Sequence, residues 1–246
     1  MNVLCGPETI DHTTQTATVD VARCRDVWLS FSYAGDGWNP YSSIIYEYMQ
    51  NPKLTYEEST YKTFLERCHL RSTQELVFGT DQKRMPPMDR GWTPFPWFPG
   101  RRPMDLKKNF SPEAVVSPGP REFVRMIRLY HKLKNEGYLP DRYPDGYIRG
   151  YFLRSRQDYR FHVLGGNHRM AVIGMLGYRT IKVKIQPIGG RPVVDLHGVD
   201  SWPNVRNGLY PRRLAIIVFQ KVFANNGKEK AESLGIYKKI FPNVEE

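Results

Sequence analysis

Hydrophobic and polar positions over residues 120–137 repeat with the period of an α-helix. Apolar side chains recur every three to four positions, and Gly137 follows as a helix stop. Four cations fall within one narrow arc of the helical wheel, while the apolar residues spread over the other side. These cations are Arg121, Arg125, Arg128 and Lys132, which we call the basic stripe. The pattern predicts an amphipathic helix.

Residues 147–154 and 159–164 alternate instead with the period of a β-strand. The four residues between them favour a turn, so we expect a β-hairpin. Further along the chain, the pattern predicts a helix over about 167–176, a strand over 180–185 and a helix from Pro211 to about Ala224.

The N-terminal third is predicted to be mainly helical after a strand around residues 18–21. Thr55 with Glu58, and Ser72 with Glu75, form capping-box patterns that favour helix starts. We expect this region to pack as a helical cover on the rest of the chain.

Six prolines interrupt residues 79–104, so neither a regular helix nor a central strand is expected there. The same loop carries four large aromatic side chains, Trp92, Phe95, Trp97 and Phe98. They are too apolar for a free linker, and we expect them to pack on a neighbouring part of the chain. A lid over a substrate is the alternative, because long ordered loops are often functional.

The composition is that of a folded chain with an uneven charge. The 246 residues are 40% hydrophobic, which is enough to bury a core. Residues before Pro120 carry 13 Lys and Arg against 14 Asp and Glu, and the remainder carries 23 against 11. A polyanionic ligand is therefore expected for the C-terminal half, whether nucleotide, nucleic acid, phosphorylated sugar or membrane surface. A solvated basic surface is the alternative.

The cysteine pattern and the hydropathy indicate the cellular compartment in which the protein is expected. Cys5, Cys24 and Cys68 lie in separate segments without a CxxC pair, which indicates neither a disulfide framework nor a zinc knuckle. No basic n-region followed by a long apolar run opens the sequence, and the aliphatic run at 214–219 is too short to span a bilayer. We expect a cytoplasmic protein without a membrane span.

The junction over residues 161–169 is the strongest candidate for a binding site. It runs from a strand through two glycines into a helix start, where free amides, the helix dipole and two cationic side chains favour an anion. The residues are Gly165, Gly166, Asn167, His168 and Arg169. An ordinary Gly-Gly turn is the alternative. His162, on the strand, is expected to be a hydrogen-bonded core or edge histidine rather than a catalytic one.

Residues 158–185 resemble the signature of the ParB/sulfiredoxin superfamily. In that signature a strand leads through a G-x-H-R or G-x-x-R loop into a helix with small residues, then a glycine and a strand. Gly166, His168 and Arg169 fill the loop positions here, and Ala171 and Gly177 fill the later ones. The resemblance implies that the loop holds the phosphates of ATP or CTP, through Gly165, Gly166, Asn167, His168 and Arg169. The resemblance as a whole extends over residues 104–187.

Departures from the signature narrow the expected activity. Sulfiredoxins carry a reactive cysteine immediately before the His-Arg pair, where this chain has Asn167, so a thiolate nucleophile is not expected. Chromosome-partition ParB proteins place two arginines in the loop, where this chain has His168 before Arg169. No convincing helix-turn-helix pattern follows residue 190.

The free-serine-kinase branch of the superfamily is the nearest in motif. Residues 105–115 are similar to its opening strand and place Glu113 where the catalytic base would be. Such a carboxylate would accept the proton of an acceptor hydroxyl, while a helix N-terminus neutralises the transferring phosphoryl group. A helix-turn carboxylate without a catalytic role is the alternative for Glu113. Asp105, Glu122 and Asp158 are lesser candidates for the base or a magnesium ligand.

These observations predict an α+β protein with a ParB/sulfiredoxin-like core, a small mixed sheet with helices, over residues 104–190. A mainly helical region over 1–103 and a helical extension over 191–246 are expected to flank it. The leading function is an ATP-dependent kinase of a small hydroxyl-bearing metabolite or sugar, with Mg²⁺ and with Glu113 and His168 as catalytic residues. A nucleic-acid-binding ParB-like nuclease or DNA-binding protein and a non-catalytic nucleotide-binding module are the alternatives.

Overall fold

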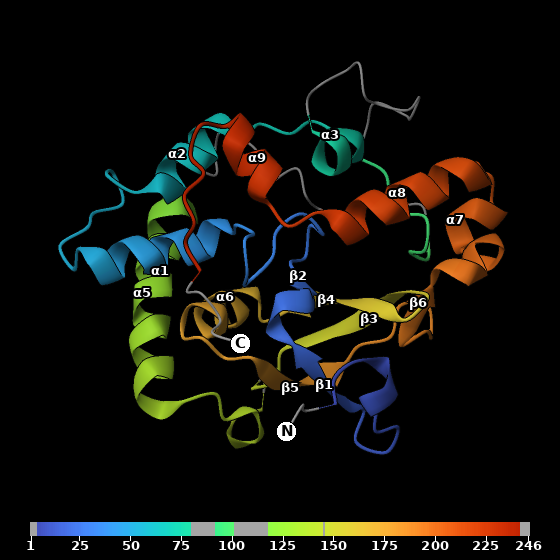
Figure 1. The fold of residues 1–246 in the computed structure, drawn as a ribbon, viewed down its shortest axis with the longest axis horizontal. Coiled ribbons are helices and arrows are strands. Elements are labelled where there is room, and N and C mark those ends of the chain that lie inside the picture. The colour runs from blue at the N-terminus through green and yellow to red at the C-terminus, as the bar shows by residue number, and fades with distance from the viewer. Residues whose placement is uncertain (1–3, 80–91, 101–117, 145, 242–246) are drawn as a thin grey trace.

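The computed structural model describes residues 4–79, 92–100, 118–144 and 146–241 (Figure 1). In these residues a mixed sheet is surrounded by helices, which confirms the expected α+β class. The strands are β1 (Thr16–Asp20), β2 (Cys24–Arg25), β3 (Arg149–Ser155), β4 (Asp158–Gly165), β5 (Thr180–Ile185) and β6 (Val193–Asp195).

The sheet has the strand order β1-β5-β3-β4-β2, and β6 pairs with β3 outside this order. β1 runs antiparallel to β5, and β3 runs antiparallel to β4. β2 is parallel to β4, and β3 is parallel to both β5 and β6. The strands come from all three regions of the predicted division, so hydrogen bonds of one sheet cross both predicted boundaries.

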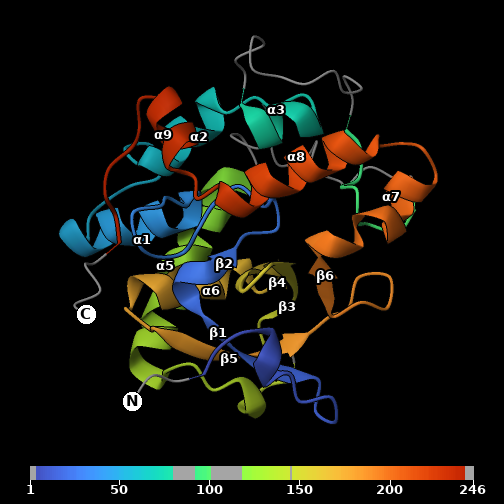
Figure 2. The same cartoon turned by 45° about the vertical axis from the view of Figure 1, so that its right-hand side comes forward.

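Helices cover the sheet from two directions. The α-helices are α1 (Pro40–Gln50), α2 (Thr60–Arg67), α3 (Thr73–Phe78), α5 (Pro118–Glu136), α6 (Asn167–Met175), α7 (Pro203–Arg206), α8 (Arg212–Ala224) and α9 (Lys228–Ser233). The 3-10 helices are η1 (Pro7–Thr9), η2 (Val21–Arg23), η5 (Pro140–Arg142) and η6 (Leu196–Ser201). α1, α5 and α6 pack on one another, and α2 packs on α1 and α5. α3, α8 and α9 lie together on one side of the sheet (Figure 2).

The long amphipathic helix and the hairpin agree with the sequence pattern. α5 buries Phe123, Met126, Tyr130 and Leu133, while the four cations of the basic stripe are exposed. β3 and β4 pair in register from Ser155 opposite Asp158, as the turn-forming residues between them predict. None of the helices within the described residues is both long and apolar enough to cross a membrane.

One of the two predicted capping boxes is wrong. Thr55 and Glu58 do bond to each other, but they close a turn ahead of α2, and Ser59 is the residue that caps this helix. Ser72 caps α3 as expected, because its hydroxyl accepts the Glu75 N–H at 3.1 Å. Helix α2 starts later than the sequence pattern predicts because its first amide, at Thr60, is bonded by a carboxylate of α1.

The described part of the proline-rich loop packs on the core, as its aromatic residues predict. Phe95 and Trp97 are buried, and Trp97 lies edge-on against Trp202 and Phe219. The three cysteines lie within the described residues and none is disulfide-bonded. Residues 80–91 and 101–104 of this loop lie outside the described part, so the lid remains an untested alternative.

His162 is a core histidine with both ring nitrogens hydrogen-bonded. Its Nε2 donates to the carbonyl of Val27 at 3.0 Å, which leaves Nδ1 to accept from the Tyr151 hydroxyl at 2.7 Å. Tyr151 in turn accepts from Trp97 Nε1 at 2.8 Å. Burial lowers the pKa of His162 to about 3. A neutral imidazole therefore joins the sheet to the proline-rich loop and to the segment that follows β2.

Candidate functional site

The turn between β4 and α6 has the backbone geometry of an anion-binding turn. Gly165 ends β4, and Gly166 follows with φ +89°, a left-handed conformation that favours glycine. A Cβ at Gly166 would lie 3.0 Å from Ile148 Cγ1, so the position is also crowded. The first helical bond runs from Met170 N–H to the Gly166 carbonyl at 2.9 Å. The amides of the first turn before Met170 therefore have no acceptor within the helix.

Asn167 turns its side chain into the protein. Its Oδ1 accepts from the Val27 amide at 3.1 Å and from the Tyr33 hydroxyl at 2.6 Å. Burial raises the pKa of Tyr33 well above its usual value, so the phenol stays protonated and remains a donor. The Asn167 side chain therefore fixes the start of α6.

His168 lies beside a carboxylate from another helix. Its Nε2 is 2.6 Å from Oε2 of Glu122, which α5 supplies. This contact lowers the pKa of Glu122, so the carboxylate is ionised at neutral pH. The Tyr41 ring of α1 packs edge-on against the imidazole, with ring centroids 4.5 Å apart. Within the described residues, His168 Nδ1 has no hydrogen-bond partner.

Two guanidinium groups flank the glycines. Arg169 donates to the carbonyls of Gly146 at 2.6 Å and Tyr147 at 3.3 Å, so it also holds the segment before β3. Arg149, at the start of β3, is exposed and pairs with Gly165 across the sheet. A Cβ at Gly165 would lie 3.2 Å from Arg149 Nε. The turn thus has cationic side chains on both of its sides.

Sequence reasoning placed some of these residues and missed others. It singled out the five residues from Gly165 to Arg169, and it gave Glu122 only a lesser role. Arg149 is not predicted, because counting from the turn sets it opposite Leu164, and a register shift between Arg149 and Gly150 brings it opposite Gly165. Glu113, the expected base, and Asp105 lie outside the described residues.

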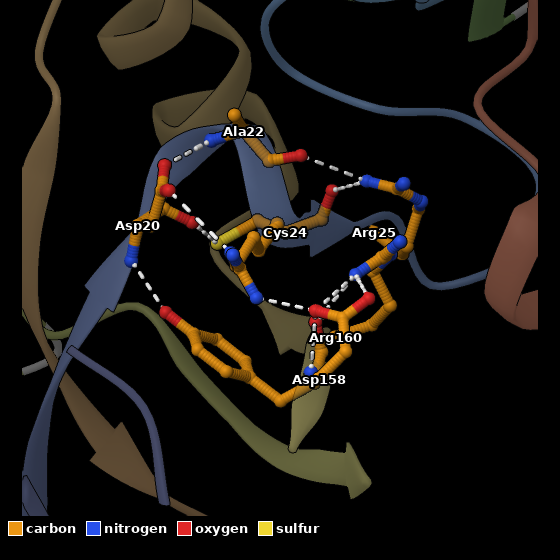
Figure 3. Close-up of polar contacts among 8 residues, drawn as sticks. Asp20, Ala22, Cys24, Arg25, Asp158 and Arg160 are labelled. Atoms are coloured by element: carbon orange, nitrogen blue, oxygen red, sulfur yellow. Dashed lines mark hydrogen bonds and ion pairs between the residues drawn. The ribbon is translucent and has the colours of Figure 1, made fainter. Parts of the chain in front are cut away.

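Asp158, the third of the lesser candidates, lies at the other end of β4 from the turn. Seven strand steps separate it from Gly165, which is roughly 23 Å. There Asp158 accepts from Arg160 Nη1 at 2.9 and 3.0 Å and forms an ion pair with Arg23 (Figure 3). These contacts tie η2 to the hairpin and keep Asp158 away from the α6 start.

Arg25 completes that cluster as a buried cation (Figure 3). It donates to the carbonyls of Ala22, Cys24 and Asn225 at 3.0, 2.9 and 2.6 Å. Burial and, to a smaller extent, the nearby Arg160 charge lower the pKa of Arg25 to about 10, so the group is still protonated at neutral pH. Its bonds join β2 to the end of α8, which is a structural role.

Comparison of the chain with protein-family models, with curated proteins and with solved structures gave no match. The likeness of residues 158–185 to the ParB/sulfiredoxin signature therefore stays a prediction from the sequence.

Proposed function

We propose that the chain binds a nucleoside triphosphate, with ATP as the reference ligand, at the β4–α6 turn and transfers its terminal phosphoryl group to a small hydroxyl compound. The observation that carries this proposal is the 2.6 Å contact between Glu122 and His168 at the first turn of α6. It sets a carboxylate–imidazole pair next to amides and guanidinium groups that suit a phosphate.

The anion-binding half of the proposal relies on the donors around the glycines. The amides of the first turn of α6 are directed at the phosphates by the helix geometry, and the helix dipole adds to their attraction. Arg149 is the exposed cation beside Gly165 and supplies a charge-assisted hydrogen bond. Arg169 supports the turn through the carbonyls that it holds.

The proton-transfer half relies on the position of the His168 ring beside Glu122. The Glu122 carboxylate lies 2.6 Å from His168 Nε2 as a charge contact that lacks the angle of a hydrogen bond, and Nδ1 lies on the other side of the ring. Nδ1 takes the proton of the acceptor hydroxyl as its oxygen bonds to the phosphorus atom, and the nucleoside diphosphate leaves. Glu122 stabilises the imidazolium that forms, as a carboxylate does in other catalytic pairs.

The resemblance also implies Mg²⁺, which would neutralise phosphate charge. Within the described residues, no group of three His, Cys, Asp or Glu side chains converges to hold a metal ion. We therefore assign no protein ligand to Mg²⁺.

Calorimetric titration of the full chain with ATP and with CTP, each with Mg²⁺, tests the binding half. Arg149→Met should weaken binding about tenfold, which corresponds to about 1.4 kcal/mol and is within the range for one charge-assisted bond. Arg128→Met, on the exposed face of α5, is the matched control and should leave the affinity unchanged. Absence of binding of either nucleotide to the unmodified protein would refute the site.

Turnover of the Glu122→Gln variant tests the proton-transfer half. Phosphorus NMR can follow ATP in the presence of serine, glycerol or ribose. The variant should bind ATP within about twofold of the unmodified protein and lose roughly 10²-fold or more in rate, the usual range for general acid–base catalysis. Glu136→Gln, at the far end of the same helix, should keep its rate. If Glu122→Gln lowers the melting temperature but leaves the rate intact, the pair is structural.

Nucleic-acid binding is the second candidate, favoured by the basic stripe on α5. Arg121, Arg125 and Arg128 line a shallow hollow of about 510 Å³ together with Val124, and all four are exposed. Binding of a short DNA duplex through these cations should weaken steeply with salt, with a log–log slope of about −0.9 per phosphate contact. Submicromolar affinity at physiological salt, lost in Arg121→Gln/Arg128→Gln, would rank this function first.

A further inference from the structure

A cavity of about 430 Å³ opens between the ends of α2 and α3 and the segment from α8 to α9. Figure 2 shows these helices on the same side of the sheet. None of the residues that line the cavity belongs to the β4–α6 turn. Sites for small molecules are usually cavities of about 300–1,000 Å³ with mostly apolar walls and a few polar groups. This cavity is at the small end of that range.

The walls of the cavity combine apolar and polar side chains. Leu70, Leu76 and Leu234 supply apolar surface, and Ser30 and Asn225 supply polar atoms. The amide nitrogen of Asn225 is bonded to the Val77 carbonyl at 3.2 Å, so this wall is held in place by the end of α3. The cavity therefore has a defined shape that suits a compact ligand.

Lys230, in α9, is the residue that defines the chemistry of the cavity. Its Nζ donates to the Leu76 carbonyl at 3.1 Å, which uses one of its three N–H groups. Within the described part of the chain, the other two have no acceptor, and no carboxylate lies within ion-pair distance of Nζ. Lys221 of the same wall is different, because Glu229 pairs with it at 2.9 Å.

The surroundings of Lys230 favour an added anion. Burial lowers the pKa of Lys230 more than the nearby Asp26 and Glu75 charges raise it, so the surroundings as a whole penalise the charged form. The Cys68 thiol beside it is buried, and burial raises its pKa to about 11, so it is neutral at pH 7. A half-buried ammonium without a contacting counter-ion is an unfavourable arrangement that an anion relieves.

We propose that this cavity binds a small organic anion, a carboxylate with a compact apolar body, whose charged group is held by the Lys230 ammonium. The carboxylate accepts the two N–H groups that Leu76 leaves unused, and the leucine side chains cover the apolar body. Such a ligand is distinct from the nucleotide of the proposed function, and the cavity shares no residue with that site.

Chemical modification of the unmodified full chain is the first test. Limiting acetic anhydride acetylates lysines in proportion to their accessible neutral amine, and mass spectrometry gives the extent for each lysine. Benzoate is the probe, and benzamide is its neutral match in shape. Benzoate should slow acetylation of Lys230 at least fivefold, whereas benzamide should slow it less than twofold. Lys228, which lies over the Tyr237 ring outside the cavity, is the internal control and should not change.

Calorimetry on variants is the second test. Lys230→Met keeps most of the side-chain volume and removes the charge, so benzoate affinity should fall at least tenfold. Lys228→Met should bind benzoate like the unmodified protein. If Lys230→Met does not fold, the acetylation result on the unmodified chain decides alone. Equal protection by benzoate and benzamide, or no protection by either, would overturn the proposal.

Discussion

Asn167→Ala is the substitution that most directly tests how the start of α6 is held. The change removes the one oxygen that accepts both the Val27 amide and the Tyr33 hydroxyl. Tyr33 is fully buried, so water cannot replace the lost acceptor there. A buried donor left without a partner costs about 1–3 kcal/mol, and two such donors give an expected loss of about 2–6 kcal/mol in the free energy of unfolding.

Urea denaturation followed by tryptophan fluorescence measures this loss, with the slope of the transition checked for constancy. Asn167→Asp is the matched control, because a carboxylate keeps both acceptor positions and suits the N-terminus of a helix. It should stay within about 1 kcal/mol of the unmodified protein. In the double variant with Tyr33→Phe, part of the Asn167→Ala loss should disappear, because one of the two donors is then absent. A loss below about 0.5 kcal/mol for Asn167→Ala, or an equal loss for Asn167→Asp, would refute the reasoning.

Three further substitutions test features of the fold. Burial raises the pKa of Asp26 to about 6, above the ordinary value of about 3.9, so the folded state holds this proton more tightly. About 3 kcal/mol of stability present below pH 4 is therefore lost as the pH rises through 6, and urea titrations of Asp26→Asn should not show that loss. Gly166→Ala should lower the melting temperature more than Gly177→Ala. Both positions have positive φ, but a Cβ at Gly177 meets open space. Equal shifts would contradict the crowding at Gly166. Tyr151→Phe should cost about 2–4 kcal/mol in urea because it leaves the His162 ring without a donor and removes the acceptor of a buried indole; an unchanged midpoint would show that this hydrogen-bond chain is dispensable.

Local sequence patterns predict an element correctly where that element is stabilised by its own residues. α5 and the β3–β4 hairpin follow from periodicity and turn chemistry, because their apolar faces repeat regularly within one segment. The start of α2 could not be found in this way. The Thr60 amide is bonded at 2.9 Å by the Glu47 carboxylate of α1, and that contact overrides the capping pattern at Thr55. β2 could not be predicted from local sequence either, because its two residues form a strand only through pairing with β4.

The candidate site likewise has one part that the local sequence predicts and one part that it does not. The glycine turn and its cations are consecutive in sequence, so the anion-binding chemistry could be predicted from residues 165–169. The partner of His168 could not, because Glu122 is separated from it by the whole of the hairpin and comes close only when α5 packs on α6. Spacing along the chain carries no information about such a pair. The pair forms only because two helices pack on each other.

The segment from Asp26 to Tyr33 lies between the two proposed sites, because it supports the α6 start on one side and lines the cavity on the other. Val27 and Tyr33 bond to Asn167 at the α6 start, while Ser30 lines the cavity that contains Lys230. A ligand that orders this segment from either side changes the free energy of the same atoms. By thermodynamic reciprocity, any factor by which an anion in the cavity alters nucleotide affinity is the factor by which the nucleotide alters affinity for the anion. Titrating each ligand in the presence of the other would measure a single coupling constant twice.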